Sequence, residues 1–223
     1  MYIDHKTLVT HDRHQHAIVL KWSPIKGNTD ALTQKIHELT PLFVNTYVKQ
    51  EMEFARHHPE AIATDFMLKS LTLFAKDLQK IDWQVFGQQL QKHMHNFFMT
   101  MDWKTKSSTD DTYFFVVAHD TKDDAPLGAL QFFISPTFEP ASIKAALFGM
   151  NNDAYDRGIE QLLMSSIFKI RPDITRIFLH TRSTNQEAID RYLSWGFVVT
   201  PNKIPHWTDM EYCIEKSNTL QNK

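Results

Sequence analysis

The sequence contains little cysteine, no long apolar run and no excess of basic residues. Cys213 is the single cysteine among 223 residues, so no intramolecular disulfide can form and a reducing compartment is expected. The best apolar run, residues 113–118, is far shorter than the roughly 20 residues that cross a bilayer. Residues 1–10 are polar and lack the apolar segment of a signal peptide. We therefore expect a cytoplasmic protein without a membrane partner.

The charge balance and the histidines argue against two further kinds of partner. The formal net charge of −2 lacks the positive excess that a nucleic-acid backbone attracts. Among the twelve histidines, His14 and His16 would share one face of a strand, yet no cysteine or recurring carboxylate completes a ligand set. We expect neither nucleic acid nor a metal ion to bind.

The first half of the chain has the pattern of one strand followed by helices. Alternating residues 16–22 predict the strand, which the breaker Ser23-Pro24 would end. Asp30 can cap a short helix, and Thr40-Pro41 has the pattern of a second helix start. Phe43, Tyr47 and Phe54 recur at helical spacing behind it, which is typical of a buried helix face.

Two further helices are expected before residue 101. His58-Pro59 ends the preceding helix, and apolar stripes then run over residues 60–81 and 83–97. Residues 104–112 form a polar loop that separates two architectures. Residues 1–111 therefore hold the first strand and an enlarged helical part, which we expect to cover the acceptor side of a site or to form a homodimer contact.

The second half, residues 112–223, alternates strands and helices. We expect helices from Gly158 and over residues 185–195, and strands over residues 113–119, 127–135, 143–150, 176–182, 197–200 and 210–215. The prediction is a single α/β (α+β) domain over residues 1–223. Its mixed, mostly antiparallel twisted sheet would have about six to seven strands flanked by helices.

Two segments of the second half resemble the GNAT-type N-acetyltransferase superfamily. Residues 181–197, TRSTNQEAIDRYLSWGF, resemble the family pattern of Thr, Asn, Ala-Ile, Tyr and Gly-Phe at the same spacings. Residues 146–163 resemble its cofactor strand, pyrophosphate loop and helix start. Fainter likeness at residues 16–31 and 206–210 brings the resemblance to about half the chain. It implies a GNAT-like fold and transfer of an acetyl group from acetyl-CoA to a primary amine by direct attack.

The resemblance also implies where acetyl-CoA would bind. Backbone N–H groups at a helix start attract a diphosphate, and Gly158 lets the chain turn closely around it. The amides in question belong to Asp156, Arg157, Gly158 and Ile159. By position in the family, amides of the preceding strand would hold the thioester, and these belong to Phe148, Gly149 and Met150.

Candidate catalytic residues follow from the same alignment and from the needs of acyl transfer. Tyr192 matches the family position whose phenol protonates the leaving sulfur, although helical spacing alone also fits a core aromatic. Asn185 fits either a pantetheine contact or a helix cap. For the general base, His180 and Glu139 lie near strand ends, and a water chain to solvent would serve equally.

The phosphate loop departs from the family pattern at two positions. Tyr155 stands where Gln or Arg is usual, and Glu160 stands where Gly or Ala is usual. A carboxylate beside a diphosphate costs electrostatic energy unless it turns away or pairs, for example with Arg157. These departures keep open a non-catalytic CoA-binding or protein-interaction module with a degenerate pyrophosphate loop, and a helical scaffold protein is a third alternative.

The acceptor is not encoded in a recognisable motif. The near-neutral surface is compatible with an amine-bearing small molecule, of the polyamine or antibiotic kind, and equally with a protein N-terminus or a lysine side chain. An amine-bearing acceptor, small molecule or protein, is therefore the expected partner.

Overall fold

A computed structural model describes residues 6–77, 80–139 and 141–214. Within these residues one mixed sheet has the strand order β1-β2-β3-β4-β5-β6-β8-β7. Neighbouring strands are antiparallel, except that β5 and β6 are parallel. The strands are β1 (Lys6–His11), β2 (Ala17–Lys26), β3 (Thr112–Asp120), β4 (Pro126–Ile134), β5 (Ser142–Met150), β6 (Arg176–Arg182), β7 (Val198–Thr200) and β8 (Trp207–Cys213).

The expected mixed, mostly antiparallel sheet is confirmed, with eight strands where about six to seven were predicted. The strand that the sequence did not indicate is β1, which pairs along β2 from Lys6 opposite Trp22 to His11 opposite Ala17. The last residue of the final predicted strand, Glu215, lies outside the described residues.

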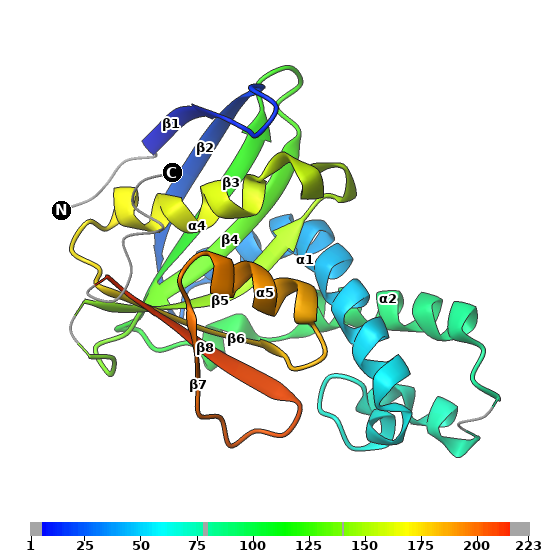
Figure 1. The fold of residues 1–223 in the computed structure, drawn as a ribbon. Helices are drawn as coiled ribbons and strands as arrows, with labels where there is room; N and C mark the ends of the chain where they lie inside the picture. The colour runs from blue at the N-terminus through cyan, green and yellow to red at the C-terminus, as the bar shows by residue number, and fades with distance from the viewer. Residues whose placement is uncertain (1–5, 78–79, 140, 215–223) are drawn as a thin grey trace.

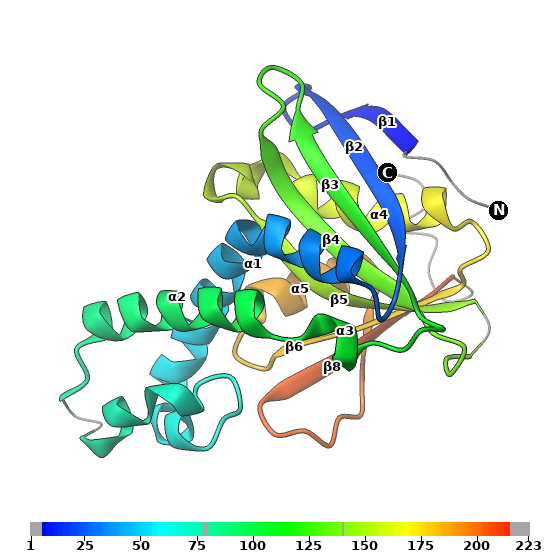
Figure 2. The same ribbon diagram turned by 180° about the vertical axis from the view of Figure 1, so that it is seen from behind.

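Helices cover both faces of the sheet. Figure 1 shows α4 and α5 in front of it, and Figure 2, which views the opposite face, shows α1 and α3 in front of that face, with α2 beside α1. The helices are α1 (Asp30–His57), α2 (Trp83–Thr100), α3 (Trp103–Lys106), α4 (Ile159–Ile170) and α5 (Gln186–Ser194), with short 3-10 helices η1 (Pro59–Ala63), η2 (Lys69–Lys76) and η4 (Asn152–Arg157). No helix in the described ranges is both long enough and apolar enough to cross a membrane.

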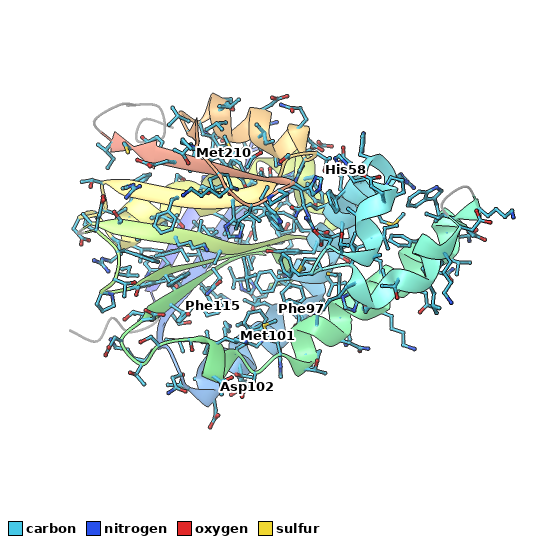
Figure 3. All side chains as sticks on the ribbon, turned by 90° about the horizontal axis from the view of Figure 1, so that it is seen from below. His58, Phe97, Met101, Asp102, Phe115 and Met210 are labelled. Carbon is cyan, nitrogen blue, oxygen red and sulfur yellow. The ribbon has the colours of Figure 1, made fainter. Side chains whose placement is uncertain are left out.

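Each face of the sheet has its own apolar core. On the α4 side, Leu163 and Ile167 pack with Leu130 of β4 and Ile177 of β6. On the α1 side, the cluster contains Phe43, Phe98 and Phe115, and Phe97 of α2 packs against it (Figure 3). Every large apolar side chain removed from water in this way contributes roughly 1.5–3 kcal/mol, so the two cores hold both helical layers on the sheet.

The predicted helix break at Thr40-Pro41 is wrong, because α1 runs unbroken from Asp30 to His57. Pro41 removes one backbone donor, but Thr40 donates its hydroxyl to the carbonyl of Ile36 at 2.9 Å and packs fully buried. The helix is pressed onto β5 at Gly149, where a Cβ atom would lie 2.7 Å from the backbone of α1. Packing against the sheet therefore overrides the local preference for a break.

The expected end of the first strand at Ser23-Pro24 is also wrong, because β2 continues to Lys26. Pro24 is paired with Phe114 of β3 on one side, whereas the pairing with β1 reaches only to Trp22 on the other. Proline has no backbone N–H to donate, and it is tolerated there because no described strand pairs with Pro24 on the side away from β3.

The apolar stripe over residues 60–81 does not form the predicted regular helix. It folds instead as η1 and η2, joined by turns, although Met67 and Leu71 are buried as the stripe indicated. The cause lies at Asp65, whose carboxylate accepts the amide of Met67 at 2.9 Å and also bonds Arg182. A short polar side chain that bonds its own backbone competes with helix formation.

Candidate active site

A cleft opens where two parallel strands separate. β5 and β6 pair only from Ser142 opposite Arg176 to Lys144 opposite Phe178. Beyond that point the strands diverge toward α1 (Figure 1), and the register between β4 and β5 skips Ala146, which marks a bulge. The cleft and the solvent at its open mouth together occupy about 850 Å³. Its walls come from β5, β6, α1 and α5.

Tyr192 and Asn185 of α5 both line this cleft. Asn185 caps the helix, since its side chain accepts the amide of Ala188 at 3.3 Å, and its amide nitrogen lies 3.3 Å from the side-chain oxygen of Gln50 on α1. Asn185 is therefore both the cap of α5 and part of the wall of the cleft. Burial raises the pKa of Tyr192 to about 12, against an opposing effect of the Arg191 charge and with a smaller contribution from Tyr47, so the phenol stays protonated at neutral pH.

Tyr47 of α1 is a cleft residue that the sequence did not single out. Its hydroxyl lies 3.5 Å from the carbonyl of Ala146, the bulged residue of β5. Burial, and then the charge of Glu51, raise the pKa of Tyr47 above its usual range. Its spacing with Phe43 and Phe54 indicated only a buried helix face, so no local pattern distinguished it from a core aromatic.

The two proposed bases lie in different places. His180 lines the cleft, stands opposite Asp209 of β8 and meets the ring of Trp207 edge-on at 5.2 Å. Desolvation by the surrounding side chains, and then the charge of Lys144, lower the pKa of His180 below its usual 6.5, against an opposing effect of Asp209. The ring is therefore mostly neutral at pH 7 and able to accept a proton.

Glu139 is not brought to the cleft. It precedes β5 at the end where β5 and β6 are still paired, and its carboxylate accepts from Arg176 at 2.9 Å. The side chain is 78% exposed and lies outside the residues that line the cleft. The structure thus separates the two candidates that the sequence left open.

The three proposed thioester amides have different surroundings. Phe148 lines the cleft, whereas Gly149 lies beneath the backbone of α1. The amide of Met150 donates to the hydroxyl of Thr46 at 2.9 Å, and the same hydroxyl lies 3.3 Å from the phenol of Tyr155. A helix of the first half therefore already occupies one backbone donor that the sequence assigned to the cofactor.

The proposed phosphate loop lines a second cavity at the start of α4, which together with the solvent at its opening occupies about 560 Å³. Gly158 is the N-cap of α4 with φ of +73°, a left-handed conformation that glycine adopts without strain. Gly158 and Asp156 line this cavity, whereas the side chain of Ile159 is buried in the core. The chain thus turns at the predicted glycine.

Glu160 does pair with an arginine, but Arg157, the example that the sequence offered, is not its partner. Arg157 donates instead to Asp12 at 2.6 Å and to Asp120 at 2.9 Å, which ties the loop to the turn after β1 and to the end of β3. Glu160 forms its ion pair with Arg191 of α5. These partners are far apart in sequence, so spacing within the loop could not reveal them.

Arg191 belongs to a chain of charges across the mouth of the cleft. Besides Glu160 of α4, it donates to Glu187 at 2.7 Å, and Glu187 accepts from Lys49 of α1 at 3.2 Å. The ring of Tyr155 lies under the same Lys49, 5.0 Å from its ammonium. The charges of three helices therefore meet at one end of the cleft.

A second arginine cluster has a fully buried Arg182 and Glu51 and a nearly buried Asp65. Arg182 of β6 bonds Glu51 of α1 at 2.9 and 2.5 Å and Asp65 at 2.8 Å. Its guanidinium carbon lies 3.9 Å from the ring centre of Phe54 and 4.4 Å from that of Trp207. The cluster fixes α1 and the segment after it to β6, and no pattern in the sequence indicated it.

Comparison with known structures decides the fold. The GNAT domain of PAT from S. lividans matches with a TM-score of 0.51 and 14% sequence identity, over 96% of this chain and 99% of that domain. The fold is that of the GNAT acetyltransferases. Spermidine N-acetyltransferase from Vibrio cholerae, solved with CoA and spermine, matches with a TM-score of 0.44 and 13% identity, over 87% and 96% of the two chains.

Other comparisons add less. Ard1 from Thermoplasma volcanium matches the structure with a TM-score of 0.38 and 22% identity, over 45% of this chain and 70% of that one. No protein-family model matches the sequence, and comparison with curated proteins gives no match. The GNAT likeness therefore concerns the fold alone.

The residues of this GNAT fold suit acetyl-CoA in two respects. The cleft between β5 and β6 carries apolar side chains such as Leu179, Ala145 and Met164, which suit a pantetheine arm. The cavity at Gly158 lies at a helix start and is lined by Arg13 and Arg191, which suit phosphate, but also by Asp156 and Glu160, which do not. Among the described residues, no three His, Cys, Asp or Glu side chains lie together so as to hold a metal ion.

Proposed function

We propose that this chain is an acyl-CoA-dependent N-acyltransferase that moves an acetyl group from acetyl-CoA to a primary amine by direct attack in a ternary complex. One observation carries the proposal: the cleft between the separated strands β5 and β6 holds a protonated phenol, Tyr192, and a mostly neutral imidazole, His180. These are the two proton-transfer groups that aminolysis of a thioester needs.

The chemistry assigns one proton to each group. The amine nitrogen bonds to the thioester carbonyl carbon and the carbon–sulfur bond breaks, while His180 accepts the proton that the amine loses. Tyr192 donates a hydrogen bond, and then its proton, to the departing sulfur, and solvent restores it. Because its pKa is about 12 and that of an ordinary thiol is near 8.5, the hydrogen bond is the larger part of its contribution.

Further residues of the cleft fit positioning roles. The amide of Phe148 is the proposed thioester contact, and Asn185 contacts the pantetheine while capping α5. The carboxylate of Glu53 also lines the cleft, and it favours an acceptor that carries positive charge.

Two successive measurements test the proposal. Titration with acetyl-CoA should raise the unfolding temperature, because a ligand that binds only the folded chain stabilises it. Acetyl-CoA with a panel of polyamines, aminoglycoside-like amines and peptides should then release free thiol and acetylated amine. Absence of any thermal shift would remove both the enzyme and every CoA-binding alternative.

A non-catalytic CoA-binding module is the second candidate. It is favoured by the ion pair of Glu160 with Arg191 at the mouth of the cleft and by Thr46 on the amide of Met150. The module predicts stabilisation by acetyl-CoA without thiol release for any amine. Thiol release that depends on Tyr192 and His180 would exclude it.

A further inference from the structure

Two arginines flank the cavity at the start of α4. Arg13 reaches it from the turn after β1, where its amide donates to the carbonyl of Arg157 at 2.9 Å. A Cβ atom at Gly158 would lie 3.6 Å from Cβ and 3.7 Å from Nε of Arg13, so this side chain lies beside the loop. Arg191 reaches the same cavity from α5.

Arg191 stands where the cleft and the cavity meet. Arg191 and Glu160 both line the main cleft, the cavity at Gly158 and a smaller cavity between them. The side chain of Arg191 is 26% exposed and that of Glu160 is 13% exposed. A ligand that extends from the cavity into the cleft must therefore pass this ion pair.

On the basis of the proposed function, we propose that Arg191, aided by Arg13, binds the diphosphate of CoA and that Glu160 competes with the diphosphate for Arg191. A guanidinium binds phosphate with two parallel N–H bonds, as it binds a carboxylate, so the two anions are interchangeable partners. Arg157 cannot take this role, since it does not line the cavity at Gly158 and its guanidinium bonds Asp12 and Asp120. Tyr155 contributes no positive charge to the loop.

Competition and structural support predict opposite effects of removing Glu160. If Glu160 holds Arg191 away from phosphate and also repels it, Glu160→Gln should tighten CoA binding roughly threefold to tenfold. Arg191→Gln should weaken it roughly tenfold or more, because it removes charge-assisted hydrogen bonds to phosphate, and Arg13→Gln should weaken it less. If the pair only holds α4 and α5 together, both changes at the pair weaken binding alike.

The experiment is calorimetric titration of the full chain and its variants with CoA and with pantetheine, which lacks the diphosphate. Pantetheine should bind the parent, Glu160→Gln and Arg191→Gln equally. Arg171→Gln is the matched control, because Arg171 forms a similar pair with Asp173 at the other end of α4, outside the cavities. Unfolding temperatures without ligand establish that each variant is folded.

The outcomes separate this inference from the proposed function. Opposite shifts for CoA with none for pantetheine support it, and these shifts without acetyl transfer would leave the inference standing while the enzyme fails. Equal weakening by Glu160→Gln and Arg191→Gln, or equal effects on pantetheine, would overturn the inference while CoA binding and transfer persist.

Discussion

The cleft has two walls, and they come from two regions of the chain. Residues 142–195 supply β5, β6 and α5 with His180, Asn185 and Tyr192, whereas α1 supplies Thr46 and Tyr47. The first wall is continuous in sequence and follows a recognisable spacing. The second wall exists only because a long helix is fixed against the sheet, so its geometry depends on distant contacts.

The two walls determine different properties of the site. The wall from α5 and β6 carries Tyr192 and His180, the proposed proton donor and acceptor, which lie close together in the sequence. The wall from α1 is held in place by the close approach at Gly149 and by the buried Arg182 cluster, and it controls access to the amide of Met150. The proposed catalytic residues thus come from residues 142–195, whereas the residues of α1 shape the other side of the cleft.

The largest expected effect comes from breaking the contact between the regions at Arg182. Arg182→Met leaves Glu51 and Asp65 buried without a cation, which should cost about 3–5 kcal/mol of unfolding free energy. Denaturant unfolding measures it. Arg171→Met, which breaks the partly exposed pair with Asp173, should cost about 1 kcal/mol or less. Equal losses in the two variants would mean that burial does not distinguish these pairs.

The pH dependence of stability gives a second view of the same cluster. Burial alone would raise the pKa of Asp65, but the hydrogen bonds and the charge of Arg182 outweigh this effect and lower it. A carboxyl with a lowered pKa in the folded state contributes stability above its ordinary 3.8, which is lost as the pH falls through the folded value. Glu51 contributes in the opposite direction, because burial raises its pKa despite the bonds and charge of Arg182. Arg182→Met removes the lowering effect on both carboxyls, so the stability of the variant should fall less on acidification than that of the parent.

The next effect compares one phenol from each wall. Tyr192→Phe should lower kcat about 100-fold, the low end of the range for proton donation, while the Kd for acetyl-CoA is unchanged. Tyr47→Phe removes a weak 3.5 Å bond to Ala146 and should lower kcat less than about tenfold. Steady-state rates and titrations measure both. A larger loss for Tyr47→Phe would move the proton donor to the wall from α1.

The wall formed by residues 142–195 was well predicted from the sequence, because the patterns that indicate its strands and helices are local. The strands and helices after residue 112 follow clear alternation, helical stripes and turn residues, and the spacing from Thr181 to Gly196 placed Asn185 and Tyr192 on one short helix. His180 at the end of β6 follows from the same spacing. Gly158 was recognisable because a tight turn before a helix favours glycine.

The rest depended on contacts between distant residues. Arg182 with Glu51, and Glu160 with Arg191, join residues 131 and 31 positions apart, which no spacing rule detects. Pro41 inside α1 shows that packing on β5 outweighs a local helix-stop pattern. Tyr47 was indistinguishable from a core aromatic until the position of the helix was known.

A smaller effect concerns the pH dependence of His180. The pKa of His180 lies below 6.5 and the base must be neutral, so kcat/KM should fall only on the acid side of that value. Lys144→Met removes a positive charge and should move the acid limb to higher pH. Asp209→Asn removes a negative charge and should move it to lower pH. Identical profiles for the three proteins would exclude His180 as the base.

The smallest expected effect tests whether α1 controls access to the amide of Met150. Thr46→Val keeps the shape of the side chain but removes the hydroxyl that accepts this amide at 2.9 Å. The loss should cost about 0.5–1.5 kcal/mol of unfolding free energy, and Thr46→Ser, which keeps a hydroxyl, should cost less. If acetyl-CoA uses the freed amide, it should raise the unfolding temperature more in Thr46→Val than in the parent. Equal ligand-induced shifts in all three proteins would mean that Met150 contributes nothing to cofactor binding, and that α1 shapes the cleft only through Tyr47 and its neighbours.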